Sequence, residues 1–313
     1  MSSDDFMFAA CCGSILNTIV LIAGYKANTV LRPIDICIMN LAVIDLGMSL
    51  IGCPFVFYSF LTHGWKFGMI GCQLYGMMGS FLGYASINIL TLIAVLRYIV
   101  MRHRAQAIWI NTKTTVLKGL VAVNVAALFW SITPFIGWGQ FDIEPTKTSC
   151  TVKFWDKSAN VLSYIISIFL FNFVIPMVLI LFTYCRVAQA LRGHTCLSKT
   201  SQTAEQRITK IGIAITTGFF ITWSPYAIVC FWETFHSEPV KPAVIKAFPT
   251  VFAKTATLIN PIIYVIIVKR FRLIIKHEIL WWIFGKHKKE SPDMNRSIEL
   301  ELQPRESTHT MLV

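Results

Sequence analysis

The stretch Ala243-Val-Ile-Lys-Ala-Phe-Pro-Thr-Val-Phe-Ala-Lys-Thr-Ala-Thr-Leu-Ile-Asn-Pro-Ile-Ile-Tyr-Val-Ile-Ile-Val268 decides the fold class of this chain. About 20 apolar residues cross the hydrocarbon core of a bilayer as a helix, and this stretch is long and apolar enough to do so. From Phe248 to Val268 it carries one lysine, Lys254, and no other charged side chain. A charged lysine at mid-membrane depth costs ~2.5–3.5 kcal/mol on insertion scales. Lys254 avoids that cost by losing its proton or by pairing with a buried anion.

The position of Lys254 also indicates a chemical role. A neutral amine in apolar surroundings is a nucleophile that condenses with an aldehyde. The sequence therefore suggests a carbonyl ligand, held covalently inside a membrane protein.

Six further stretches of the chain are long and apolar. The 313 residues are 55% hydrophobic and 14% charged, whereas a soluble domain is about 25% charged. Hydropathy predicts seven spans, at about 6–26, 34–60, 72–98, 115–138, 159–185, 208–233 and 243–268. We therefore expect an all-α membrane protein with a seven-helix domain over residues 6–268.

The basic residues are divided unevenly between the two ends of this predicted bundle. Of the 28 Lys and Arg residues, 21 fall on the side of the C-terminal tail and 6 on the other side. Basic loops mark the cytoplasmic side. The sequence thus predicts an integral protein of the plasma membrane, with an extracellular N-terminus (1–5) and a cytoplasmic C-terminus. The net charge of +12 lies in loops and the tail, so it does not indicate nucleic-acid binding.

Two segments follow the last span. Residues 269–285 alternate apolar and basic side chains near helical spacing, which predicts an amphipathic helix on the anionic lipids of the cytoplasmic leaflet. Residues 286–313 are polar and predicted to be disordered. Serines and threonines in this tail are candidate phosphate acceptors.

The seven spans carry residues that resemble the G protein-coupled receptor family. The matching stretches include Asn40-Leu-Ala-Val-Ile-Asp45, Trp223-Ser-Pro225 and Asn260-Pro-Ile-Ile-Tyr264. Cys72 opens the third span and Arg97 closes it, as in that family. Lys254, seven residues before Pro261, stands where opsins attach retinal, so the chain resembles the opsins. Stretches such as Gly64-Trp-Lys-Phe-Gly68 make it most similar to the neuropsin group.

The resemblance implies a retinal site with a Schiff base on Lys254, which needs a counterion to stay protonated. Many vertebrate visual opsins have a carboxylate where this chain has Tyr75, so we expect Glu144 on the extracellular lid to serve instead. A solvated loop carboxylate is the alternative for Glu144, and Asp142 and Glu233 are weaker counterion candidates. The implied pocket further contains Gly79, Gly83, Phe169, Phe173, Phe219, Trp223 and Tyr226, although small and aromatic residues also serve ordinary helix packing.

The nine cysteines include no CxxC and no metal-like spacing with histidine, so no metal site is expected. The resemblance pairs Cys72 with Cys150 in a disulfide that fixes the lid to the third span; two buried thiols are the alternative. Neuropsins commonly carry a lysine at the position of Cys53, and its absence weakens an expectation of ultraviolet absorption.

A second set of residues is implied as the activation switch. Its members are Asp45, Arg97, Tyr184, Glu205, Asn260, Pro261 and Tyr264. Asp45 and Asn260 would form a buried polar set with Asn17 and Ser86. The usual acid before Arg97 is replaced by Leu96, so Glu205 is the expected partner of Arg97.

The resemblance thus implies a light-sensing receptor that is not an enzyme and that activates a heterotrimeric G protein. A retinal photoisomerase and a chemically activated receptor are the alternatives. Membrane lipids, together with arrestin and a receptor kinase at the tail, are the further partners that it implies.

Overall fold

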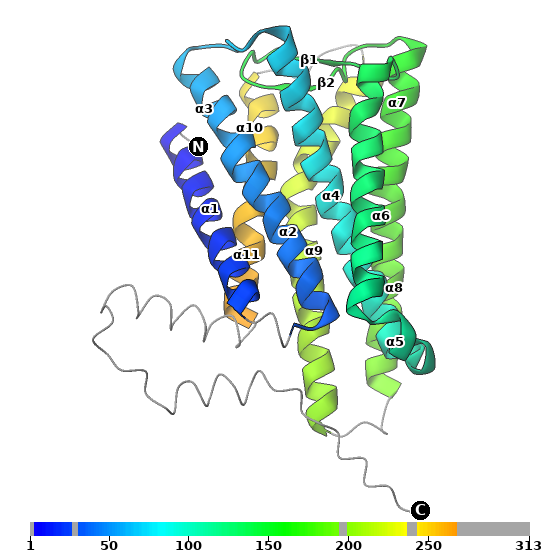
Figure 1. The fold of residues 1–313 in the computed structure, drawn as a ribbon. Coiled ribbons are helices and arrows are strands. Elements are labelled where there is room, and N and C mark those ends of the chain that lie inside the picture. The colour runs from blue at the N-terminus through cyan, green and yellow to red at the C-terminus, as the bar shows by residue number, and fades with distance from the viewer. Residues whose placement is uncertain (1–2, 27–30, 194–198, 237–242, 268–313) are drawn as a thin grey trace, which may run out of the picture.

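The computed structural model describes residues 3–26, 31–193, 199–236 and 243–267. Long helices run side by side as a bundle, and a small hairpin of β1 and β2 closes one end, here called the hairpin end (Figure 1). The helices are α1 Ser3–Lys26, α2 Pro33–Gly47, α3 Cys53–Leu61, α4 Gly68–Arg102, α5 Arg104–Ile110, α6 Lys113–Ile132, α7 Ala159–Phe169, α8 Ile175–Gly193, α9 Lys199–Phe235, α10 Ala243–Lys254 and α11 Ala256–Ile267.

Six helical segments within the described ranges are long and apolar enough to cross a membrane, and they coincide with the first six predicted spans. The seventh crossing is divided between α10 and α11, each of 12 residues, with Thr255 between them. At 1.5 Å per residue the two helices together have the length that a bilayer requires. The structure therefore has the expected seven-helix membrane architecture.

Two of the crossings contain a π-helical turn. The turn η2, Met48–Gly52, joins α2 to α3 just before Pro54, and η4, Leu170–Val174, joins α7 to α8 just before Pro176. The ring of a proline clashes with the preceding helical turn, and a wider turn before it makes room for the ring. Both turns change which side chains face the bundle interior.

The central helix of the bundle is α4. It contacts α2, α6, α8, α9 and both strands, and its buried residues include Leu90, Ile93 and Ala94. Apolar side chains such as Val125, Phe182 and Ile221 are exposed on the outside. An apolar exterior of this kind suits a surface that faces lipid.

The hairpin was not predicted from the sequence. Strand β1, Phe141–Ile143, pairs antiparallel with β2, Cys150–Val152, with Phe141 opposite Val152. Cys72 on α4 and Cys150 on β2 form a disulfide with a Cα–Cα distance of 5.3 Å. The predicted disulfide is thereby confirmed, and the alternative of two free thiols is excluded.

Several boundaries differ from the sequence-based prediction. Helix α1 begins at Ser3, inside the predicted extracellular tail 1–5, and the short helix α5 was not predicted. The predicted amphipathic helix 269–285 and the tail 286–313 lie outside the described residues.

Candidate functional site: a cavity around Lys254

Lys254 is the last residue of α10, at the interruption of the seventh crossing. Hydrogen bonds of the i to i−3 kind replace the α-helical ladder here: Thr255 N–H donates to Phe252 O, and Leu258 N–H donates to Thr255 O, both at 3.0 Å. The Thr257 hydroxyl donates to the carbonyl of Lys254 at 3.0 Å. From α1, Asn17 donates its side-chain amide to Thr257 O at 2.9 Å. The local break is therefore stabilised by side chains, and Lys254 lies directly before it.

The side chain of Lys254 lines a cavity of about 380 Å³ in the hairpin half of the bundle. That volume is in the range of small-molecule sites, about 300–1,000 Å³. All ten residues predicted for the ligand pocket line it: Lys254, Glu144, Tyr75, Gly79, Gly83, Phe169, Phe173, Phe219, Trp223 and Tyr226. The structure thus brings the ten together, while their role in binding a ligand stays a prediction.

Tyr75 on α4 is the aromatic neighbour of the lysine. The Lys254 Nζ atom lies 5.8 Å from the centroid of the Tyr75 ring. The Tyr75 hydroxyl donates to the carbonyl of Gly52, in η2, at 3.1 Å. Buried Cys53 follows Gly52 and is close enough to interact electrostatically with Lys254. The amine thus lies near two side chains, the phenol ring of Tyr75 and the thiol of Cys53.

Glu144 is a carboxylate at the wall of the same cavity. It follows β1, is 3% exposed, lines the cavity and lies within electrostatic reach of Lys254. Its backbone N–H donates to Ser149 O at 2.9 Å, and its carbonyl accepts the N–H of Lys147 at 2.7 Å. The Thr146 hydroxyl donates to Glu144 Oε2 at 3.3 Å. This tight turn holds the carboxylate inward, which does not fit a solvated loop residue.

The other two counterion candidates are placed differently, and neither lines the cavity. The Asp142 carboxylate pairs with Lys153 Nζ at 3.3 Å. Glu233 lies near the end of α9, where Lys157 Nζ donates to the carbonyls of Glu233 and Thr234 at 2.5 and 2.6 Å. Of the three carboxylates, Glu144 has the position that the prediction requires.

The hairpin closes the cavity as a lid with three attachments. One is the disulfide of Cys150, and the second joins the hydroxyls of Thr151 and Tyr226, 2.7 Å apart. The third is Lys157, which caps the C-terminal carbonyls of α9, a position that favours a cation. Beside it, the N–H of Ser158 donates to Asp156, which holds the pKa of that carboxyl below its usual value.

Aromatic rings from α7, η4 and α9 form much of the cavity wall. Trp223 stacks on Phe219 with ring centroids 5.5 Å apart, and Phe169 stacks on Phe173 at 5.3 Å. A Cβ atom added to Gly83 would lie 3.0 Å from Trp223 Cη2, whereas one added to Gly79 would meet no atom within 4 Å. Gly83 therefore admits the indole of Trp223, and Gly79 faces open space.

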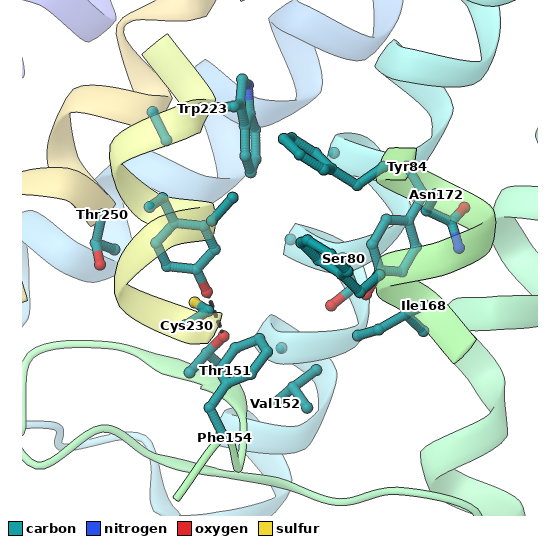
Figure 2. Close-up of a pocket in the computed structure, with 18 of the residues that line it drawn as sticks. Ser80, Tyr84, Thr151, Val152, Phe154, Ile168, Asn172, Trp223, Cys230 and Thr250 are labelled. Carbon is teal, nitrogen blue, oxygen red and sulfur yellow. Dashed lines mark hydrogen bonds between the residues drawn. The ribbon is translucent and has the colours of Figure 1, made fainter. Parts of the chain in front are cut away.

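Sequence reasoning missed several polar residues of the cavity wall. These include Ser80, Tyr84, Thr151, Asn172 and Thr250 (Figure 2). Ser80 and Tyr84 follow Gly79 and Gly83 directly, so the glycine spacing contained a signal for them. Asn172 lies in a π-helical turn, whose side-chain register a regular helical repeat does not give.

The predicted switch residues are partly connected to one another. Asn260 donates its amide to Asp45 Oδ2 at 2.8 Å, which joins the seventh crossing to α2. Asn17 and Ser86 bond elsewhere, to the carbonyls of Thr257 and Leu82. The predicted set of four therefore contains one direct pair, Asp45 with Asn260.

Arg97, at the opposite end from the hairpin, is 3% exposed, and Pro261 is also buried. A Cβ on Gly212 would clash with the Tyr184 hydroxyl, so α8 and α9 are in close contact there. The side chains of Glu205 and Tyr264 lie outside the described residues, and the expected pairing of Glu205 with Arg97 stays a prediction.

Known proteins resemble this chain both in sequence and in fold. Residues 16–264 match the family described as 7 transmembrane receptor (rhodopsin family). Human Opsin-5 is 34% identical over 264 residues, which cover 82% of this chain and 74% of Opsin-5. The human visual pigment-like receptor peropsin is also 34% identical over 264 residues, covering 82% of this chain and 78% of peropsin. The crystal structure of squid rhodopsin has the same fold, with a TM-score of 0.82 at 23% identity over 100% of this chain and 91% of that one.

Proposed function

Because this chain belongs to the rhodopsin family of seven-transmembrane receptors, and within it to the opsins, we propose that it is a light-sensing receptor. It binds retinal through a Schiff base on Lys254 and activates a heterotrimeric G protein after photoisomerisation. The observation that carries the proposal is one lysine amine at the wall of a lidded, largely apolar cavity.

The residues present fit retinal. A long apolar polyene needs an apolar cavity, and aromatic side chains and Gly79 provide one, with open space above Gly79. Its aldehyde needs an amine, which Lys254 supplies. When bound, retinal supplies light absorption followed by a change of shape.

The protein's own groups then hold that ligand and its charge. Glu144, inside the lid, provides a negative charge for a protonated nitrogen on Lys254. The Tyr75 ring offers its face to the same cation. The lid, attached at Cys150 and Thr151, covers the cavity on this side, and a lower local dielectric strengthens these interactions.

A change in the shape of the ligand would reach α9 through the aromatic side chains that line the cavity. Trp223 lines the cavity and lies two residues before Pro225, the residue at which α9 lacks a backbone N–H donor. A ligand that fits one orientation of α9 better than another shifts the receptor toward that state. The outward movement of α9 would then open a groove for the G protein near Arg97. Tyr184, Glu205 and Tyr264 would stabilise the resting state or the open state of the receptor.

The proposed orientation follows the charge distribution of the loops. The hairpin end faces outside and the Arg97 end faces the cytoplasm, in the plasma membrane. Arrestin and a receptor kinase are proposed partners of the C-terminal tail.

The experiment reconstitutes the purified receptor with retinal, records its spectrum, and illuminates it with a G protein present. We expect a pigment band, and nucleotide exchange that depends on light. A band with light-driven retinal release but no exchange would favour a photoisomerase. Exchange driven by a diffusible compound, with no band, would favour a chemically activated receptor.

A further inference from the structure

The short helix α5 has an exposed apolar face to which the proposed function gives no role. The helix joins α4, which ends at Arg102, to α6, which begins at Lys113. Ile108 and Trp109 on α5 are 75% and 79% exposed. Adjacent large apolar side chains with this exposure point to a partner that covers them, because leaving them in water is unfavourable.

The contacts of α5 determine which of its side chains face outward. The N–H of Ala107 donates to the carbonyl of His103 at 2.9 Å, which starts the helix directly after α4. At this corner the rings of His103 and Tyr98 meet edge to face with centroids 5.5 Å apart. Ile110 packs against the core of the bundle. The helix is therefore docked through its Ile110 side, which leaves the other apolar face outward.

The position of α5 places this face at the surface of the membrane. Its neighbours in sequence, α4 and α6, both belong to membrane crossings. It packs mainly against α4 and projects at the edge of the bundle, at the end opposite the hairpin (Figure 1). Tryptophan prefers the interface between the headgroups and the acyl chains. A helix at that depth lies along the membrane with its apolar side chains among the acyl chains.

The charges around α5 indicate which lipid it would bind. Residues 102–118 contain four Lys or Arg residues, and the sequence has no Asp or Glu between Asp45 and Asp142. Arg102 and Lys118, on either side of α5, are exposed. In the proposed orientation this end faces the cytoplasmic leaflet, which contains anionic phospholipids. One basic residue close to such a surface strengthens binding about fivefold.

From this arrangement we infer that α5 is a membrane anchor that binds anionic phospholipids. Ile108 and Trp109 insert among the acyl chains, and the basic residues on either side of the helix hold the headgroups. The anchor fixes the depth of the end of α4, five residues after Arg97. The inference takes only its orientation from the proposed function and does not depend on retinal.

The test follows the fluorescence of Trp109 in the full-length receptor in lipid nanodiscs, taken as the difference between wild type and Trp109→Phe. Phospholipids with brominated acyl chains quench a tryptophan that they touch, whereas acrylamide quenches one that faces water. We expect the brominated lipids to quench the Trp109 emission and acrylamide to leave it nearly unchanged. At equal mole fractions, brominated phosphatidylserine should bind at this site about fivefold more strongly than brominated phosphatidylcholine.

The double variant Arg102→Gln and Lys118→Gln tests the role of the charges. Measured against its own Trp109→Phe counterpart, it should bring the ratio of the two binding constants close to one. Quenching by brominated phosphatidylcholine should persist, because the apolar face is unchanged. Lys66→Gln is the matched control, since it removes an exposed lysine that precedes α4 at the hairpin end. The preference for phosphatidylserine should be unchanged in this control.

Three outcomes would overturn the inference. Quenching of Trp109 by acrylamide but not by brominated lipid would place the face in water, and protection from acrylamide by an added G protein would assign the face to a protein partner. Equal quenching by the two brominated lipids in wild type would exclude selection by headgroup charge. A preference that survives the double variant would show that Arg102 and Lys118 do not hold the headgroups. All these measurements are made without retinal, so the proposed function is tested separately.

Discussion

The hydroxyl oxygens of Tyr226 and Thr151 lie 2.7 Å apart, which ties the lid to α9. Tyr226 is three residues after Trp223, and their rings meet edge to face with centroids 6.1 Å apart. A movement of the indole therefore reaches the lid through one side chain. The cover of the cavity and the helix proposed to move are in this way mechanically connected.

Tyr226→Phe should loosen the lid without changing the shape of the wall. One lost hydrogen bond corresponds to about 0.5–1.5 kcal/mol. Hydroxylamine should therefore attack the pigment about twofold to tenfold faster in the dark. Thr151→Val should have the same effect, and the double variant should be no faster than either single one. Additive effects of the two variants would show that the residues act separately.

The pair of Asn260 and Asp45 should stabilise the bundle. Asn260→Ala removes the amide that donates to Asp45 Oδ2 at 2.8 Å and leaves a buried carboxyl group without that donor. We expect the free energy of unfolding to fall by about 1–3 kcal/mol, visible as a lower melting temperature in detergent. Asp45→Asn, which keeps a polar partner for Asn260, should cost less. Equal melting temperatures for wild type and Asn260→Ala would refute the assigned contact.

Gly79 and Gly83 should respond differently to the same substitution. Alanine is favoured over glycine within a helix by about 0.5–1 kcal/mol, and Gly79→Ala meets no atom within 4 Å. This variant should therefore raise the melting temperature of the ligand-free receptor. Gly83→Ala places Cβ 3.0 Å from Trp223 Cη2 and should lose that gain by displacing the indole. An equal rise in both variants would contradict the placement of Trp223 against α4.

Glu144→Gln should move the pigment band to shorter wavelength. The change removes the negative charge within reach of Lys254, and an unprotonated Schiff base absorbs at shorter wavelength than a protonated one. Asp142→Asn is the matched control, because Asp142 pairs with Lys153 and does not line the cavity. A shift in the control but not in Glu144→Gln would assign the counterion to Asp142 instead.

Much of this molecule could be predicted from sequence, because length and hydropathy determine membrane spans locally. The opsin resemblance is confirmed by the relatives, and the predicted disulfide by the structure. The interruption at Thr255 could not be predicted in this way, since it depends on Asn17, which donates to Thr257 O from 240 residues away. Asn172 was missed for a related reason, because a π-helical turn alters the side-chain register that a helical repeat predicts.

The central claim is the covalent attachment of retinal to Lys254, and chemical trapping tests it most directly. Borohydride reduces the C=N bond of a Schiff base to a stable secondary amine, after which peptide mass spectrometry locates the retinyl group. Our account predicts a retinyl group on the peptide that contains Lys254, and none on any peptide of Lys254→Ala. A retinyl group on another lysine, or a pigment that persists in Lys254→Ala, would contradict it.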